Sequence, residues 1–142
     1  MTPAAKGEGA GAPARKPRAM GGDSFARFLG LEHDGPGVTR LRVTPKLLNG
    51  TGLLLGPVGF ALVDFAMGSA LWAQRNPGES IATINIAINY IQGARAGEII
   101  CRATLDRRNR HIAVLTASVH DEQGQLLITS VGSFSIFMAK QR

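Results

Sequence analysis

The longest apolar stretch of the chain, residues 58–73, contains one charged side chain, Asp64. Apolar residues would lie on every side of a helix formed by this stretch, which is typical of a helix that other elements surround. Pro57 favours a helix start, because its φ is already helical and no N–H is needed there. The sequence Asn-Pro-Gly at 76–78 favours an end. The pattern predicts a central buried helix over residues 57–74.

Alternation of apolar and polar residues predicts strands on both sides of this helix. Residues 38–43 alternate as expected of a strand with one face in water. Four more predicted strands follow the helix, at 81–91, 98–106, 111–120 and 126–137. Turn-forming residues at 107–110 and 121–124 predict that hairpins join the last three strands.

The order of these elements indicates an α+β fold. A short helix, which Asp23 and Ser24 can cap and Gly30 can end, comes first. One strand, the long helix and four strands follow, and an antiparallel sheet curled around the long helix packs them most economically. Such a sheet leaves an edge strand exposed, with which a second copy of the chain can pair.

Composition sets residues 1–22 apart from the rest of the chain. This segment has four basic residues against one acidic residue, which gives +3 of the total charge of +6, and almost no large apolar side chains. We expect a flexible basic tail here, followed by one domain over residues 23–142. Its glycines and prolines oppose an amphipathic helix, so a solvated tail is favoured over one that binds nucleic acid or a membrane surface.

Several other classes of protein are disfavoured. Residues 53–73 are long enough to suggest a membrane span, but Asp64 would lie near the centre of the bilayer. No phosphate-binding loop, dinucleotide-binding glycine pattern or serine-elbow motif is present. The sole cysteine, Cys101, excludes an internal disulfide and fits a reducing cytoplasm. The three histidines lack metal-ligand spacing: His33, His111 and His120.

Asp64 is the main candidate for chemistry. A carboxylate among apolar residues is costly to bury unless another group pairs with it. It is the only charged residue between Lys46 and Arg75, so a partner must come from elsewhere in the fold, from water or from a substrate.

Residues 49–68, NGTGLLLGPVGFALVDFAMG, carry a family resemblance. They resemble the signature of hotdog-fold acyl-CoA thioesterases, in the phenylacetyl-CoA type branch of the 4-hydroxybenzoyl-CoA thioesterase superfamily. That signature runs roughly Asn, a glycine-rich loop, His-Gly-Gly, four residues, Leu, one residue and Asp. The strand at 82–90 and later turns extend the resemblance over nearly all of 23–137. Its specific part is the spacing of Asn49, Gly56 and Asp64.

The resemblance implies an acyl-CoA thioesterase, a homodimer or a tetramer of paired dimers, with no cofactor apart from the CoA of its substrate. Asp64 would act as general base or nucleophile against the thioester carbonyl. The backbone amide of Gly56, at the positive end of the helix, would stabilise the oxyanion. Asn49 and Thr83 match polar positions that orient water or the carboxylate in the family.

Helix geometry favours a site shared between two chains. Asp64 follows Gly56 by eight positions, which is about 12 Å along a helix at about 1.5 Å per residue. One reacting carbonyl needs its hydrogen-bond donor and its base each within about 3 Å. Two chains with opposed helices can exchange these groups, as the family's dimer does.

Two departures from the signature bear on activity. Leu55 stands at the family's histidine position and Pro57 at the second glycine. The histidine is a polar group that helps to place the substrate carbonyl, so its loss predicts reduced activity. The alternative is a non-catalytic hotdog protein that binds acyl-CoA or lipid.

Each site residue also has a structural interpretation. Asp64 would be a hydrogen-bonded carboxylate at a dimer interface, Gly56 a helix cap and Asn49 a turn former. Strict alternation puts Thr83 on the face opposite Ile84, so Thr83 can approach Asp64 only from an edge position or a bulge. Four arginines are candidates for the CoA phosphates, although charged hairpin tips are commonly just solvated: Arg95, Arg107, Arg108 and Arg110.

Overall fold

The computed structural model describes residues 18–19 and 24–140. Two α-helices and a short 3-10 turn are present: α1 (Ser24–Leu29), α2 (Gly56–Trp72) and η1 (Pro45–Leu47). The strands are β1 (Arg18–Ala19), β2 (Glu32–His33), β3 (Val38–Arg42), β4 (Glu79–Tyr90), β5 (Glu98–Arg108), β6 (Ile112–Asp121) and β7 (Leu126–Met138).

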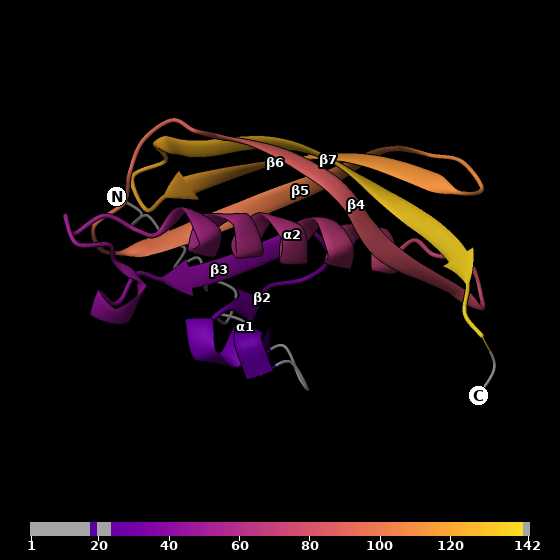
Figure 1. The fold of residues 1–142 in the computed structure, drawn as a ribbon, viewed down its shortest axis with the longest axis horizontal. Coiled ribbons are helices and arrows are strands. Elements are labelled where there is room, and N and C mark those ends of the chain that lie inside the picture. Colours follow the sequence, from indigo (N-terminus) through magenta and orange to yellow (C-terminus); the bar gives the residue numbers. More distant parts are fainter. Residues whose placement is uncertain (1–17, 20–23, 141–142) are drawn as a thin grey trace, which may run out of the picture.

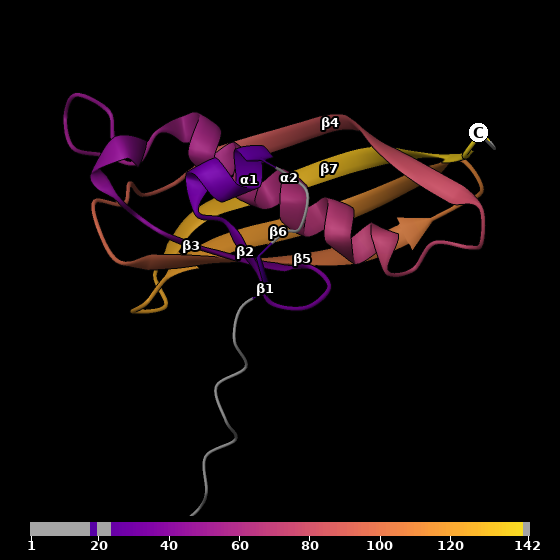
Figure 2. The same cartoon turned by 90° about the horizontal axis from the view of Figure 1, so that it is seen from below.

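All neighbouring strands pair antiparallel in one seven-stranded sheet of order β1-β2-β3-β5-β6-β7-β4. The sheet curls over α2, which lies along its inner face (Figures 1 and 2). After α2 the chain crosses to the far edge, so β4 pairs with β7 and not with its sequence neighbour β5. This arrangement confirms the predicted α+β hotdog fold.

The predicted elements are present with small shifts at their ends. The long helix begins at Gly56 and ends at Trp72, and all four strands after it are found. β5 continues to Arg108, so the first hairpin turn is shorter than the predicted turn at 107–110. The pair β1 and β2 was not predicted, because two residues are too few to show alternation.

The predicted tail lies almost entirely outside the described residues. Within it, Arg18 and Ala19 form β1 and pair with His33 and Glu32 of β2. The flexible tail and the domain start at residue 23 therefore stay predictions. In the part of the chain that is described, neither helix is long and apolar enough to cross a membrane.

The core lies between α2 and the sheet. Leu62, Val63, Ala66 and Met67 are fully buried on the side of the helix that faces the strands. Packing there is tight, because a Cβ on Gly132 of β7 would come within 2.7 Å of the Met67 sulfur. The helix and sheet are thereby held at a fixed separation.

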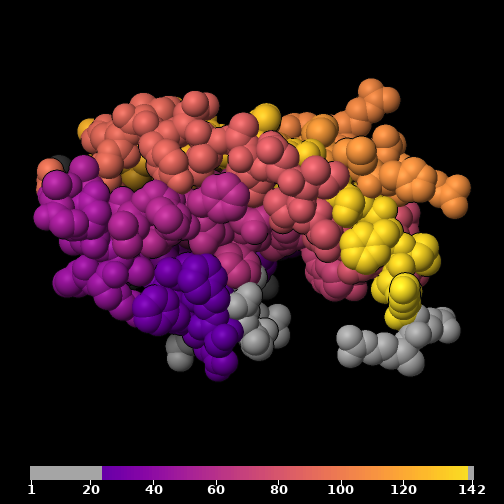
Figure 3. Space-filling model, viewed as in Figure 1, coloured from indigo at the N-terminus to yellow at the C-terminus, as the bar shows by residue number. Residues whose placement is uncertain are grey.

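The opposite side of α2 is less covered than the sequence predicts. Phe60 and Trp72 are 36% and 46% exposed, and Asp64 and Gly68 between them are half-buried. These four residues recur every four positions, so they form one stripe along the helix. Figure 3 shows magenta side chains of α2 at the surface between β4 and the N-terminal segment. The chain's own sheet surrounds only part of its central helix.

Candidate functional site

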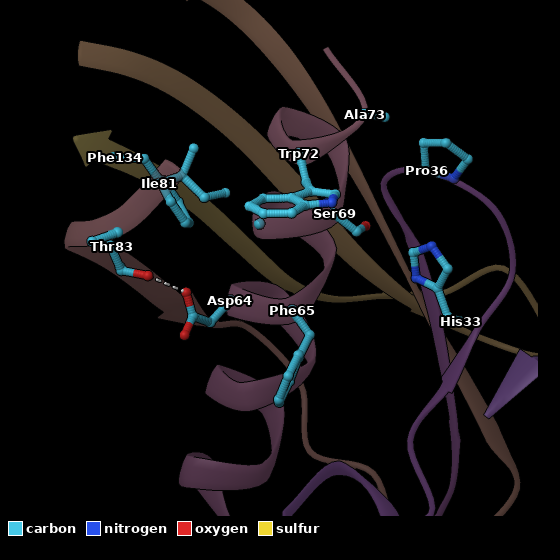
Figure 4. Close-up of a pocket in the computed structure, with 12 residues that line it drawn as sticks. His33, Pro36, Asp64, Phe65, Ser69, Trp72, Ala73, Ile81, Thr83 and Phe134 are labelled. Carbon is cyan, nitrogen blue, oxygen red and sulfur yellow. Dashed lines mark hydrogen bonds between the residues drawn. The ribbon is translucent and has the colours of Figure 1, made fainter. Parts of the chain in front are cut away.

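Asp64 lies halfway along α2, on this open stripe. The Thr83 hydroxyl donates a hydrogen bond to Asp64 Oδ1 at 2.7 Å (Figure 4). One carboxylate oxygen thus has a partner from across the fold, as the sequence requires of a carboxylate in this setting. No hydrogen bond to Asp64 Oδ2 is found among residues 24–140.

Thr83 reaches Asp64 because of an irregularity in β4. The pairing of β4 with β7 shifts register between Thr83 and Asn85, which makes Ile84 the extra residue of a β-bulge. Ile84 is 55% exposed, whereas the threonine beside it turns toward the helix. β4 is also an edge strand of the sheet. Both conditions stated for the approach of Thr83 are met.

A cavity of about 550 Å³ opens beside Asp64 and Thr83. Apolar side chains line most of it: Phe65, Trp72, Ile81 and Phe134. The Arg75 guanidinium lies over the indole ring of Trp72, 3.5 Å from the ring centre, and so favours this position of the ring. His33 and Pro36 form the wall opposite Asp64 and Thr83 (Figure 4).

Gly56 occupies the first position of α2 and offers a free backbone amide. The N–H groups of Val58 and Gly59 are bonded to the Leu55 carbonyl, and Pro57 has no N–H. The Gly56 N–H has no hydrogen-bond partner in the described part of the chain. A 17-residue helix places partial positive charge at this end. This single amide is suited to an oxyanion.

Tyr90 holds the start of the helix from the other side. Its hydroxyl donates a hydrogen bond of 2.7 Å to the Gly56 carbonyl, and burial raises the pKa of Tyr90. A Cβ at Gly56 would lie 3.4 Å from the Tyr90 ring, which is an ordinary contact distance. Sequence reasoning missed this residue. Alternation marks Tyr90 only as a strand position.

Gly56 and Asp64 line separate cavities. The second cavity, of about 270 Å³, is lined by Asn49, Leu55, Gly56 and Tyr90 among others. It shares no lining residue with the cavity beside Asp64. Each chain therefore holds the carboxylate and the free amide in two separate cavities, which we call the Asp64 half-site and the Gly56 half-site.

Asn49 shapes the loop before α2. Its Oδ1 accepts hydrogen bonds from the Thr51 N–H at 2.9 Å, the Thr51 hydroxyl at 2.8 Å and the Leu53 N–H at 3.1 Å. Arg95 braces the same loop through a 3.0 Å bond from Nη1 to the Thr51 carbonyl. The turn-forming interpretation accounts for the three hydrogen bonds that Asn49 Oδ1 accepts. The amide Nδ2 of Asn49 donates to none of the described residues and can bind a ligand.

The four candidate arginines do not lie together. Arg95 precedes β5, whereas Arg107, Arg108 and Arg110 lie at the other end of that strand, about 30 Å away at about 3.3 Å per residue. One chain therefore cannot gather them around one CoA molecule. Arg108 is also engaged elsewhere, in a two-bond pair with Glu79 at 2.9 and 2.8 Å. Hydrogen bonds, chiefly from Arg108 and next from the Asn76 N–H, lower the pKa of Glu79 to about 2.

Fold and half-sites together define a hotdog protein with a carboxylate on its central helix and an amide donor at the start of that helix. The family model of the thioesterase superfamily matches residues 51–128, and the chain belongs to that superfamily. Among the curated proteins, none matches the chain.

Solved structures share this fold. A thioesterase from Haemophilus influenzae is 22% identical, with 85% of this chain and 87% of that chain covered and a TM-score of 0.80. A Bacillus halodurans protein solved with CoA is 25% identical, with 80% and 75% covered and a TM-score of 0.76. A putative phenylacetic acid degradation-related thioesterase from Ralstonia eutropha is 24% identical, with 78% and 88% covered and a TM-score of 0.69.

Proposed function

We propose that this chain hydrolyses acyl-CoA thioesters to a carboxylic acid and free CoA, at two equivalent sites of a homodimer. The observation that carries the proposal is the separation of Asp64 and Gly56 into two cavities, each with half of the groups that thioester hydrolysis needs. Membership of the thioesterase superfamily supports the reaction class. The structure solved with CoA supports CoA as the thiol.

Two features of the chain support a dimer in which the half-sites meet. β4 is an edge strand, and the stripe Phe60, Asp64, Gly68 and Trp72 is open along α2. Two copies that pair along β4 cover both features at once, with their helices opposed. Asp64 then lies against the partner's Gly56, and each dimer contains two complete sites. Such dimers can pair further into tetramers.

In such a site, the carboxylate and the amide have distinct roles. Asp64 takes a proton from a water molecule, whose oxygen attacks the thioester carbonyl carbon. The charge that develops on the carbonyl oxygen is stabilised by the partner's Gly56 N–H and its helix dipole. The C–S bond then breaks, and the CoA sulfur leaves and takes up a proton. Thr83 fixes Oδ1, which leaves Oδ2 to act on the water.

The alternative path uses Asp64 as nucleophile. Its carboxylate attacks the carbonyl carbon and displaces CoA, which gives a mixed anhydride that water then hydrolyses. Either path consumes only thioester and water and needs no metal or further cofactor. Arg95 is the arginine best placed for the CoA phosphates, because it braces the loop at the edge of the Gly56 cavity.

A second candidate function is the binding of acyl-CoA without hydrolysis. Leu55 favours it, since this side chain is 38% exposed in the Gly56 cavity at the family's histidine position. Release of free thiol from a panel of acyl-CoAs separates the two functions. We expect turnover by the wild type and its loss in Asp64→Asn. A rise in unfolding temperature with acyl-CoA, without thiol release, would instead identify a binding protein.

A further inference from the structure

The direction of the Gly56 N–H depends on how firmly the first turn of α2 is held. The Leu55 carbonyl, in the same peptide unit as this N–H, accepts from the Val58 N–H at 3.0 Å and from the Gly59 N–H at 3.5 Å. In a trans peptide the C=O and N–H point in opposite directions, so these two bonds aim the N–H away from the helix. The second bond is long, and Pro57 has no N–H to add another. The helix backbone alone holds this start weakly.

The Tyr90 hydroxyl holds the next peptide unit. It donates to the Gly56 carbonyl at 2.7 Å and so fixes the peptide that joins Gly56 to Pro57. The ring lies over the same turn, because a Cβ added to Gly56 or to Gly59 would be 3.4 or 3.5 Å from it, at ordinary contact distance. Both peptide units that flank the Gly56 Cα are then held, one by α2 itself and one by Tyr90. Because the hydroxyl bonds a carbonyl, the Gly56 N–H stays free.

Tyr90 can serve as a fixed point because the sheet anchors it. It is the last residue of β4 and pairs with Ile128 of β7. Past the end of the strand, the N–H groups of Ile91 and Gln92 both donate to the Leu127 carbonyl, at 2.8 and 3.2 Å. Burial raises the pKa of Tyr90, so its hydroxyl keeps the proton that it donates at neutral pH. The first turn of α2 is thereby tied to the sheet.

We propose that Tyr90 is a positioning residue for thioester hydrolysis: by holding the Gly56 carbonyl, it keeps the Gly56 N–H directed at the place where the oxyanion forms. This inference rests on the proposed function, because it names the residue through which the same amide is oriented. Helix ends fray readily, and a frayed first turn would let the N–H turn away from the oxyanion. Tyr90 acts through Gly56 and does not touch the reacting atoms.

Tyr90→Phe tests this role, because it keeps the ring and removes only the hydroxyl. We expect kcat for thiol release to fall by about three- to tenfold, the effect of one hydrogen bond, with little change in KM for acyl-CoA. The decisive measurement is the same change in a Gly56→Pro background, where no N–H is left to be positioned. Tyr90→Phe should there lower kcat by less than about twofold, so the two changes are not additive. A purely structural hydroxyl would give the same loss in both backgrounds.

Ser130→Ala is the matched control. The Ser130 hydroxyl also donates to a backbone carbonyl, that of Ala117 at 3.1 Å, but Ser130 lines neither cavity, so kcat should equal that of the wild type. Hydrogen exchange of backbone amides gives a second measurement that does not depend on turnover. In Tyr90→Phe the amides of Val58 and Gly59 should exchange about tenfold faster, whereas amides in the middle of α2 should be unchanged.

The outcomes separate this inference from the proposed function. An unchanged kcat in Tyr90→Phe beside a strongly impaired Gly56→Pro would overturn the inference, and so would equal losses in the two backgrounds. An unimpaired Gly56→Pro would instead remove the oxyanion role of that amide, and the proposed mechanism with it. Faster exchange at Val58 and Gly59 without any thiol release by the wild type would contradict the proposed reaction but leave the hold of Tyr90 on the helix start intact.

Discussion

The two half-sites of the chain are built in different ways. The free amide of the Gly56 half is set locally, because a proline, the Leu55 carbonyl and the helix start leave a single N–H free, although residues of four strands also line its cavity. The Asp64 half depends on the whole fold, because its threonine comes from the far edge of the sheet and its cavity includes residues of β2, α2, β4 and β7. We therefore expect loss of the Gly56 N–H to lower activity without disturbing Asp64, whereas several positions remote in sequence can disturb the orientation of the Asp64 carboxylate.

The largest effect is expected from Asp64→Asn. This change keeps the shape of the side chain and its bond from Thr83 but removes the base, so kcat should fall by about 10²–10⁴. Thiol release under saturating substrate measures the loss. Because no buried ion pair is broken, the unfolding temperature should stay within a few degrees of the wild type.

Turnover that persists in Asp64→Asn would exclude both the general-base and the nucleophilic path. Asp106→Asn is the matched control. Asp106 lies on β5, is exposed and does not line either half-site, so its replacement should leave kcat unchanged.

Gly56→Pro is expected to have the next largest effect. Proline removes the N–H, and the φ of −60° and ψ of 133° at Leu55 already suit a residue before proline. Loss of one oxyanion donor should lower kcat by about 10²–10³. The measurement is again thiol release, with circular dichroism to check that α2 is intact.

Mixed dimers test whether the two half-sites that form one active site come from different chains. Asp64→Asn and Gly56→Pro chains are each inactive alone, but a dimer of one of each contains one intact site if the half-sites come from different chains. Random exchange makes half of the dimers mixed, so about a quarter of the wild-type activity should return. No recovery in dimers shown to have exchanged would place both groups of a site in one chain.

The sequence predicts the helices and strands better than it predicts contacts that depend on how the strands pair. Alternation and the apolar stretch were enough to predict α2 and the four strands after it, since each pattern is local. The isolation of Asp64 and its spacing from Gly56 pointed to the two half-sites. The bulge at Ile84 depends on how β4 pairs with β7, which no local pattern contains. The same holds for the contact of Tyr90 with Gly56 and for the place of His33 in the cavity.

A smaller effect is expected from Thr83→Val. It removes the hydrogen bond to Oδ1 but keeps the volume and the β-branched shape, so the carboxylate loses its orientation without a change in packing. One such bond is worth about 0.5–1.5 kcal/mol, and kcat should fall by about tenfold or less. Thr104→Val on β5 is the control, because Thr104 is exposed and contacts neither cavity. Equal activity of both variants would mean that Thr83 does not position Asp64.

The smallest effect on activity is expected when the ion pair of Glu79 and Arg108 is broken. This pair joins the start of β4 to the end of β5, although these strands are not neighbours in the sheet. The pKa of Glu79 is lowered from 4.5 to about 2 in the folded chain, chiefly by hydrogen bonds from Arg108. Its pairing therefore contributes stability that is fully present above about pH 4.5 and is lost as the pH falls through about 2.

Unfolding temperature measured across this pH range should thus fall more steeply for the wild type than for Glu79→Gln or Arg108→Met. Arg110→Met, which removes a positive charge from the same hairpin without breaking an ion pair of the described residues, should follow the wild type. Because β4 also carries Thr83, loosening its start should lower activity slightly through the Asp64 half and leave the Gly56 half unaffected. Parallel curves for all four proteins would mean that the pair does not hold β4 in place.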